Sequence, residues 1–293
     1  MILRRLSSMR DTARLHLSGI ILALLASGGG AFAEGTGEGH AVPGQMGFQR
    51  GTTEMAHEMH WFHDWLLLPI ITIICLFVLA LLVWVALKFN EKAHPVPSRT
   101  THNSLLEVAW TIVPVLILVV IAIPSFRLLT KQLVLPDADM TMKITGKQWY
   151  WTYEYPQDQG GGFSFDSLLK PDSDLKPGDI RLLAVDNEAV VPIGKTIRVQ
   201  VTAADVIHSF VVQSFGARID AVPGRLNETW FKPEKEGIYY GQCSKICGKD
   251  HAFMPIAFRV VSEQEYAAWL ADAKKKFASN SAPVAVAAAD TAH

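Results

Sequence analysis

The sequence predicts an α+β membrane protein in which a two-helix transmembrane hairpin precedes an all-β domain with a terminal helix. Hydrophobic residues make up 49 % of the 293 residues, a high proportion for a soluble chain. Residues 65–87 and 108–128 are apolar runs long enough to span a bilayer. Residues 132–270 contain short alternating runs separated by Pro-Gly turns, a pattern typical of barrels and sandwiches. The net charge of −1 gives no indication of nucleic-acid binding.

The N-terminus has the pattern of a secretory signal peptide over residues 1–33. Arginines precede a short apolar core, and Ala31-Phe32-Ala33 fits a cleavage site. A mitochondrial transit peptide is the alternative, and the apolar core favours export. Residues 34–64 are expected to be a periplasmic segment whose Gly-rich part, up to about residue 50, is poorly ordered. Residues 271–293 are expected to form a disordered tail.

The connection between the two apolar runs is basic and is expected to face the cytoplasm. Export of the N-terminus and two spans then place the domain after residue 131 in the periplasm. His57, His60 and His63 precede the first span, beside Trp61 and Trp65. Their spacing does not stack them on one helix face, so we interpret this stretch as a membrane-interface belt rather than a metal site. Cys75, inside the first span, is expected to be a buried inert thiol.

The stretch that carries the chemistry runs from Cys243 to Met254 and contains Cys247 and His251. His208 lies 35 residues before the first cysteine, after a predicted strand. Sulfur and imidazole donors select copper. Zinc fits less well, because a zinc site would leave the thioether unused. A site for one copper uses one thiolate, so one of the two cysteines would be left over. Two copper ions could share both thiolates. Each metal would then take one histidine and one weak donor, either the methionine or a backbone carbonyl.

This ligand pattern, C-x-x-x-C-x-x-x-H-x-x-M with a distant histidine, resembles the dinuclear copper A site of cytochrome c oxidase subunit II. The resemblance implies a cupredoxin-like Greek-key barrel and assigns the carbonyl donor to Lys245. Three alternatives remain open for these residues. They are a disulfide between Cys243 and Cys247, a membrane-anchored copper-binding or copper-delivery protein, and a thiol-disulfide enzyme, although the last usually has C-x-x-C.

The resemblance also implies roles outside the ligand run. Trp149, in an aromatic string, would receive electrons from cytochrome c, and Glu107, at the start of the second span, would mark a proton-path entrance. Glu154, Asp186 and Asp205 would be acidic docking residues. From the residues alone, the aromatic string could be strand core, the glutamate a helix N-terminal charge, and the acids solvated surface charges.

One position departs from the family pattern. Lys245 replaces a glutamate whose carboxylate binds magnesium between subunits I and II, and an ammonium group has no acceptor for a cation. The copper prediction stands, magnesium is doubtful, and Lys245 is expected to form a salt bridge instead. The resemblance implies a subunit of an aa3-type oxidase in a bacterial inner membrane, with subunit I and subunit III as partners. Electrons from reduced cytochrome c would pass through copper to subunit I, where oxygen reduction is coupled to proton pumping.

Overall fold

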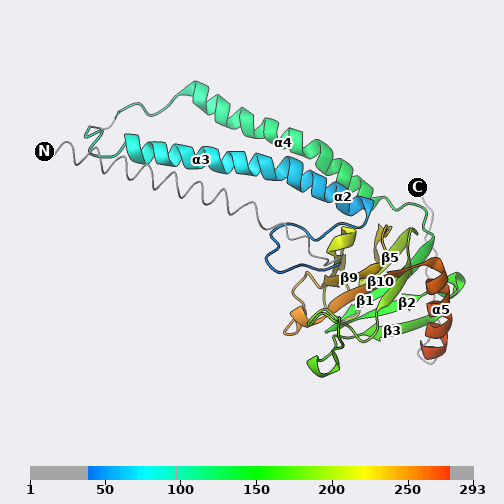
Figure 1. Ribbon diagram of the computed structural model, residues 1–293. Helices are drawn as coiled ribbons and strands as arrows, with labels where there is room; N and C mark the ends of the chain where they lie inside the picture. Colours follow the sequence, from blue (N-terminus) through cyan, green and yellow to red (C-terminus); the bar gives the residue numbers. More distant parts are fainter. Residues whose placement is uncertain (1–38, 97, 278–293) are drawn as a thin grey trace.

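Two long helices extend from a β-rich domain in the computed structural model (Figure 1). The structure describes residues 39–96 and 98–277, so the predicted signal peptide lies outside the described residues. The first helix comprises α2 (Glu54–Trp61), a π-helical stretch η1 (Phe62–Leu67) and α3 (Leu68–Lys88). The second is α4 (Ser104–Leu133). Their most apolar windows have mean hydropathies of 3.2 and 2.6 and are unburied. Both predicted spans are confirmed, and both helices extend beyond them.

Local sequence explains where these helices begin. The Thr53 hydroxyl accepts a hydrogen bond from the Ala56 N–H, and the Asn103 side chain accepts from the first turn of α4. Such caps satisfy N–H groups that have no partner within the helix. Cys75 lies on α3 and is exposed, so the expectation that it is buried was wrong for the single chain. A spanning helix presents its side chains outward to lipid or to partner helices.

The β-domain is built from ten strands within the described residues, arranged as three sheets. The five-stranded sheet has the order β3-β2-β1-β5-β8, the three-stranded sheet β4-β10-β9, and the smallest sheet pairs β6 with β7. The pairs β1–β5 and β4–β10 are parallel, which requires crossovers between the sheets. The strands are β1 (Met140–Lys147), β2 (Tyr150–Tyr155), β3 (Phe163–Ser167), β4 (Ala189–Pro192), β5 (Ile197–Ala203), β6 (His208–Val212), β7 (Ala217–Ala221), β8 (Asn227–Phe231), β9 (Gly237–Gln242) and β10 (Pro255–Val261).

Aromatic rings fill the space between the sheets. Trp151 and Tyr153 of β2 and Phe258 of β10 are fully buried. Helix α5 (Glu263–Phe277) closes one side, and its last residue stacks on Phe165 with ring centroids 4.7 Å apart. The predicted terminal helix is confirmed over Glu263–Phe277. The predicted disordered tail was therefore wrong for residues 271–277, and residues 278–293 lie outside the described residues.

The segment before α2 contacts the β-domain and has no helix or strand over residues 39–50. The Gly39 carbonyl accepts a hydrogen bond from the Tyr240 N–H at 2.8 Å. Lys131, near the end of α4, reaches Glu54 and Glu58 of α2 at 2.7 and 2.6 Å. Lys131 thus joins the two helices of the hairpin. The Trp230 indole N–H of β8 donates to the Lys131 carbonyl at 3.3 Å and links α4 to the β-domain.

Candidate metal centre

The predicted ligand run forms one loop whose two ends lie side by side. β9 ends at Gln242 and β10 begins at Pro255, and these two residues pair across the antiparallel strands. Within the loop, His251 starts the short helix η5 (His251–Phe253). His208 is the first residue of β6, and the Ser209 carbonyl accepts a hydrogen bond from the Ser244 N–H at 3.1 Å. This backbone hydrogen bond holds the start of β6, and with it the distant histidine, beside the cysteine loop.

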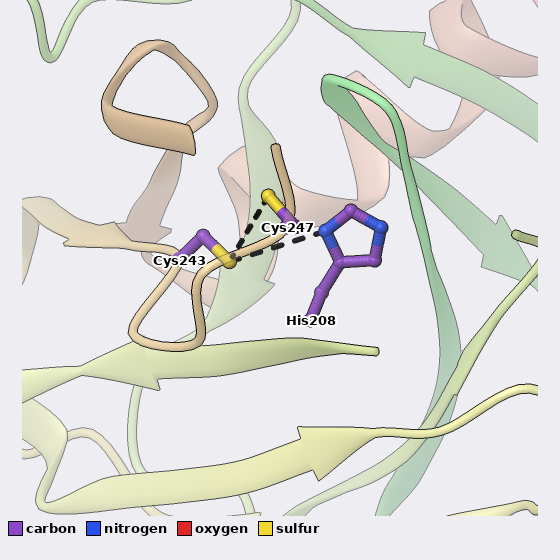
Figure 2. Close-up of side chains that lie close together, drawn as sticks. All are labelled: His208, Cys243 and Cys247. Atoms are coloured by element: carbon purple, nitrogen blue, oxygen red, sulfur yellow. Dashed lines mark hydrogen bonds between the residues drawn. The ribbon is translucent and has the colours of Figure 1, made fainter. Parts of the chain in front are cut away.

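All six predicted donor atoms converge at this end of the domain. Figure 2 shows the Cys243 and Cys247 sulfurs and the His208 Nδ1 facing one another, with the sulfurs 4.0 Å apart and Nδ1 3.9 Å from the first sulfur. The Lys245 carbonyl oxygen lies 3.3 Å from Cys243 Sγ. His251 Nδ1 and Met254 Sδ each lie 3.5 Å from Cys247 Sγ. Each sulfur thus has its own imidazole and its own weak donor nearby.

The sulfur separation fits bridging by metal and excludes a disulfide in this structure. A disulfide needs about 2.05 Å between sulfurs, and both cysteines are free. A metal about 2.3 Å from each sulfur would span the observed 4.0 Å with an S–metal–S angle of about 120°. That angle suits trigonal or tetrahedral coordination. The donor set of thiolates, imidazoles and a thioether fits copper.

The pKa values of the two thiols indicate that a cation would stabilise the form in which both are ionised. Burial opposes ionisation of Cys243, but hydrogen bonds from His208 and from backbone N–H groups outweigh it, and its pKa falls to about 7. Burial, together with the neighbouring Cys243 sulfur, raises the pKa of Cys247 to about 12. The pair therefore loses one proton readily and the second with difficulty. Cations between the sulfurs would stabilise the doubly ionised form.

Neighbouring groups hold the ligands in place. His208 Nε2 lies 2.9 Å from Asp205 Oδ1, an arrangement that turns Nδ1 toward the sulfurs. The indole N–H of buried Trp151 donates to the Met254 carbonyl at 3.1 Å. The first histidine is thus anchored to the segment before β6, and the end of the loop is anchored to β2.

Trp149 lies directly against this loop and is partly buried. Its indole N–H donates to the Cys247 carbonyl at 3.3 Å, and the Gln148 side-chain amide donates to the same oxygen at 2.7 Å. Gly248 lies under the ring, because a Cβ added there would be 2.9 Å from Trp149 Cζ2. The ammonium of Lys249 lies 5.6 Å from the ring centroid. The predicted electron acceptor is therefore one hydrogen bond from a cysteine of the ligand set.

Two family models match the chain and together cover more than half of it. The model described as the periplasmic domain of cytochrome c oxidase subunit II matches residues 140–261, and the model of its transmembrane domain matches residues 41–128. The chain belongs to the cytochrome c oxidase subunit II family. It is a membrane protein with a periplasmic domain, and it is a subunit of an oxidase complex.

Relatives in this family align over most of the chain. A probable cytochrome c oxidase subunit 2 of Rickettsia bellii is 52 % identical over 239 residues, which are 82 % of this chain and 87 % of the relative. Cytochrome c oxidase subunit 2 of Cereibacter sphaeroides is 47 % identical over 251 residues, 80 % of this chain and 82 % of the relative. The crystal structure of the periplasmic domain of subunit II from Bradyrhizobium japonicum is 62 % identical, covers 49 % of this chain and 99 % of its own, and has a TM-score of 0.46.

The predicted docking acids of this subunit II do not share one environment. Glu154 has a side chain only 13 % exposed and pairs with Lys143 at 3.0 Å. Asp186 Oδ1 accepts hydrogen bonds from the Leu168 and Asn187 N–H groups. Asp205 orients the first histidine and also accepts from the Gln148 N–H at 2.7 Å. All three carboxylates have partners within the chain.

Other predicted positions lie away from the metal ligands. Glu107 is in the first turn of α4, at the end of the hairpin far from the β-domain (Figure 1). His57 Nε2 lies 3.1 Å from Glu234 Oε2, and Phe48 contacts the rings of His60 and His63. Among the described residues, the group suited to metal binding contains His208, Cys243 and Cys247 and none of these histidines. The histidines instead contribute to the junction between the hairpin and the β-domain.

Proposed function

We propose that this subunit II holds two copper ions between Cys243 and Cys247 and uses them to pass electrons from reduced cytochrome c to the catalytic subunit. The observation that carries the proposal is the duplication of donors, because each sulfur has an imidazole nitrogen and a weaker donor within 3.9 Å. His208 and His251 would each ligate one ion, with Met254 and the Lys245 carbonyl as the weak donors. The copper pair would supply one-electron redox chemistry with little change in geometry.

The chain's own residues supply a rigid and dry environment for that chemistry. Met254 is 1 % exposed, the two cysteines are 7 and 5 % exposed, and His208 is fully buried. Asp205 holds the first imidazole in its ligating orientation, and the Trp151 indole fixes the end of the loop. Ligands that are already held in place need little rearrangement when the charge of the site changes.

Trp149 is proposed as the residue through which electrons arrive. Its N–H donates to the Cys247 carbonyl, so the ring and the metal ligands are linked through one hydrogen bond and the cysteine backbone. Its half-buried ring remains accessible at the surface. Asp186 and Asp205 are proposed to attract the lysine-rich surface of cytochrome c by electrostatic steering. Glu154 can contribute only a weaker field, because Lys143 neutralises it.

The hairpin is proposed to place this subunit in a bacterial inner membrane beside subunit I, with subunit III as a further partner. Glu107 is proposed to stand at a proton-path entrance. It lies at the hairpin end opposite the copper loop, the end expected to face the cytoplasm. The two proposed tasks, electron acceptance and proton uptake, are thus on opposite sides of the membrane.

A membrane-anchored copper carrier is the second candidate, since it would use the same donor atoms. A carrier needs exchangeable ligands and has no use for a ring hydrogen-bonded to the ligand loop. Trp149→Ala in the purified oxidase separates the two proposals. Electron transfer from cytochrome c should fall by at least an order of magnitude while copper content stays unchanged. Tyr150→Ala is the control, because this neighbouring ring contacts Lys147 rather than the loop. Equal rates of electron transfer from cytochrome c in Trp149→Ala and Tyr150→Ala would favour the carrier.

A further inference from the structure

The tip of the cysteine loop carries an exposed cation next to an exposed apolar side chain. Lys245 is exposed, and Ile246 is 85 % exposed. Only the backbone carbonyl of Lys245 turns inward, to 3.3 Å from Cys243 Sγ. Within the described part of the chain, Lys245 forms no ion pair, so the salt bridge expected from the sequence is not made inside this subunit. A solvated isoleucine and an unpaired ammonium together mark a surface that another chain can cover.

This loop tip does not fit the magnesium ion that the family pattern implies. A magnesium site needs oxygen donors, usually a carboxylate. At position 245 the family pattern has that carboxylate, whereas a protonated lysine offers three donors and no acceptor. A positive side chain there would also repel the ion. The chemistry of this residue therefore excludes it as a magnesium ligand.

The position of the loop indicates which partner covers it. In Figure 1 the orange loop that follows β9 leaves the β-domain on the side toward which the two spans extend. A membrane-embedded partner beside the hairpin would meet this tip. Covering a lysine without a counter-charge is strongly unfavourable. The partner must then present a carboxylate to Lys245.

We propose that the Lys245 ammonium replaces the interfacial divalent cation, pairing in the assembled oxidase with carboxylate groups of the membrane-embedded catalytic subunit while Ile246 packs beside them. This inference rests on the proposed assembly with that subunit. A covalently attached cation makes the contact between the subunits independent of magnesium. The subunit interface would then be insensitive to metal chelators.

Metal analysis of the purified oxidase tests the proposal. Cells are grown with Mn²⁺ in excess, and magnesium and manganese are counted per complex after treatment with EDTA. The wild type should retain neither ion in stoichiometric amount, and Lys245→Glu should gain one ion with a Mn²⁺ resonance signal. Lys249→Glu is the matched control, because Lys249 is on the same loop but its ammonium lies near Asp250 and the Trp149 ring, and this variant should gain no ion. A stoichiometric ion in the wild type, or no gain in Lys245→Glu, would overturn the proposal.

Lysine labelling of the wild-type complex gives a second readout that does not depend on a variant. An amine-reactive acetylating reagent should modify Lys249 in the intact oxidase and leave Lys245 protected. In complexes dissociated by detergent, both lysines should react. Equal modification of both in the intact oxidase would refute the proposed pairing. Copper counted in the same samples reports separately on the copper proposal, so the two can fail independently.

Discussion

Gly248→Ala should disconnect Trp149 from the metal centre without removing a ligand. An added Cβ would lie 2.9 Å from Trp149 Cζ2 and 3.1 Å from Gln148 Nε2. Ordinary contacts of a Cβ begin at 3.4 Å, so the ring must move by about 0.5 Å. Its hydrogen bond to the Cys247 carbonyl, already 3.3 Å long, would then be lost.

The size of the effect follows from this displacement. A misplacement of about 1 Å can cost roughly 100-fold in rate, so about 0.5 Å should slow electron transfer roughly 10-fold. Gly248 also has φ +130°, a conformation that side-chain-bearing residues rarely adopt. The resulting strain should cost about 1–3 kcal/mol of stability. For a chain of this size that lowers the melting temperature by about 2–4 °C per kcal/mol.

Flash-initiated electron transfer from reduced cytochrome c to the purified oxidase measures the rate, and elemental analysis checks that copper is retained. Gly178→Ala is the matched control, because Gly178 has φ +95° and an added Cβ there meets nothing within 4 Å. Both variants should lose stability, but only Gly248→Ala should lose rate. A wild-type rate in Gly248→Ala, or an equal slowing in both variants, would refute the role of the contact with Trp149.

Three further predictions concern the ligands. Cys247→Ser should abolish the spectrum of paired coppers and slow cytochrome c oxidation, whereas Cys75→Ser should change neither; a retained spectrum would refute bridging. Asp205→Ala should weaken copper affinity roughly 10- to 100-fold in chelator competition, with Asp186→Ala as the control; equal affinities would count against the orienting role. Copper affinity should rise with pH, because the thiols of Cys243 and Cys247, with pKa values of about 7 and about 12, must lose protons on binding. An affinity independent of pH, without proton release on copper addition, would contradict this.

The spans and the ligand set could be predicted because both are local in sequence. The length of an apolar run decides whether it crosses a membrane, and Cys243 to Met254 lie on one loop. The orientation of His208 could not be predicted in the same way. Asp205 precedes it by three residues and was taken for a docking acid, and nothing in the sequence indicates that its carboxylate turns toward the imidazole.

Contacts between distant residues were also outside the reach of sequence patterns. Glu154 faces Lys143 across β1 and β2, and only the strand register reveals that its charge is neutralised. Gly248 lies 99 positions after Trp149, and no periodicity connects them. The junction of Lys131 with Glu54 likewise joins two helix ends far apart in the chain. Each depends on tertiary packing, which a pattern along one chain does not encode.

The most direct test of the copper proposal is electron paramagnetic resonance of the purified oxidase, with copper counted in the same sample. Cys243 and Cys247 are proposed to hold two copper ions that would share one unpaired electron. The spectrum should then show splitting by two equivalent copper nuclei, with two ions on this chain. Splitting by a single copper nucleus, with one ion on the chain, would contradict the proposal.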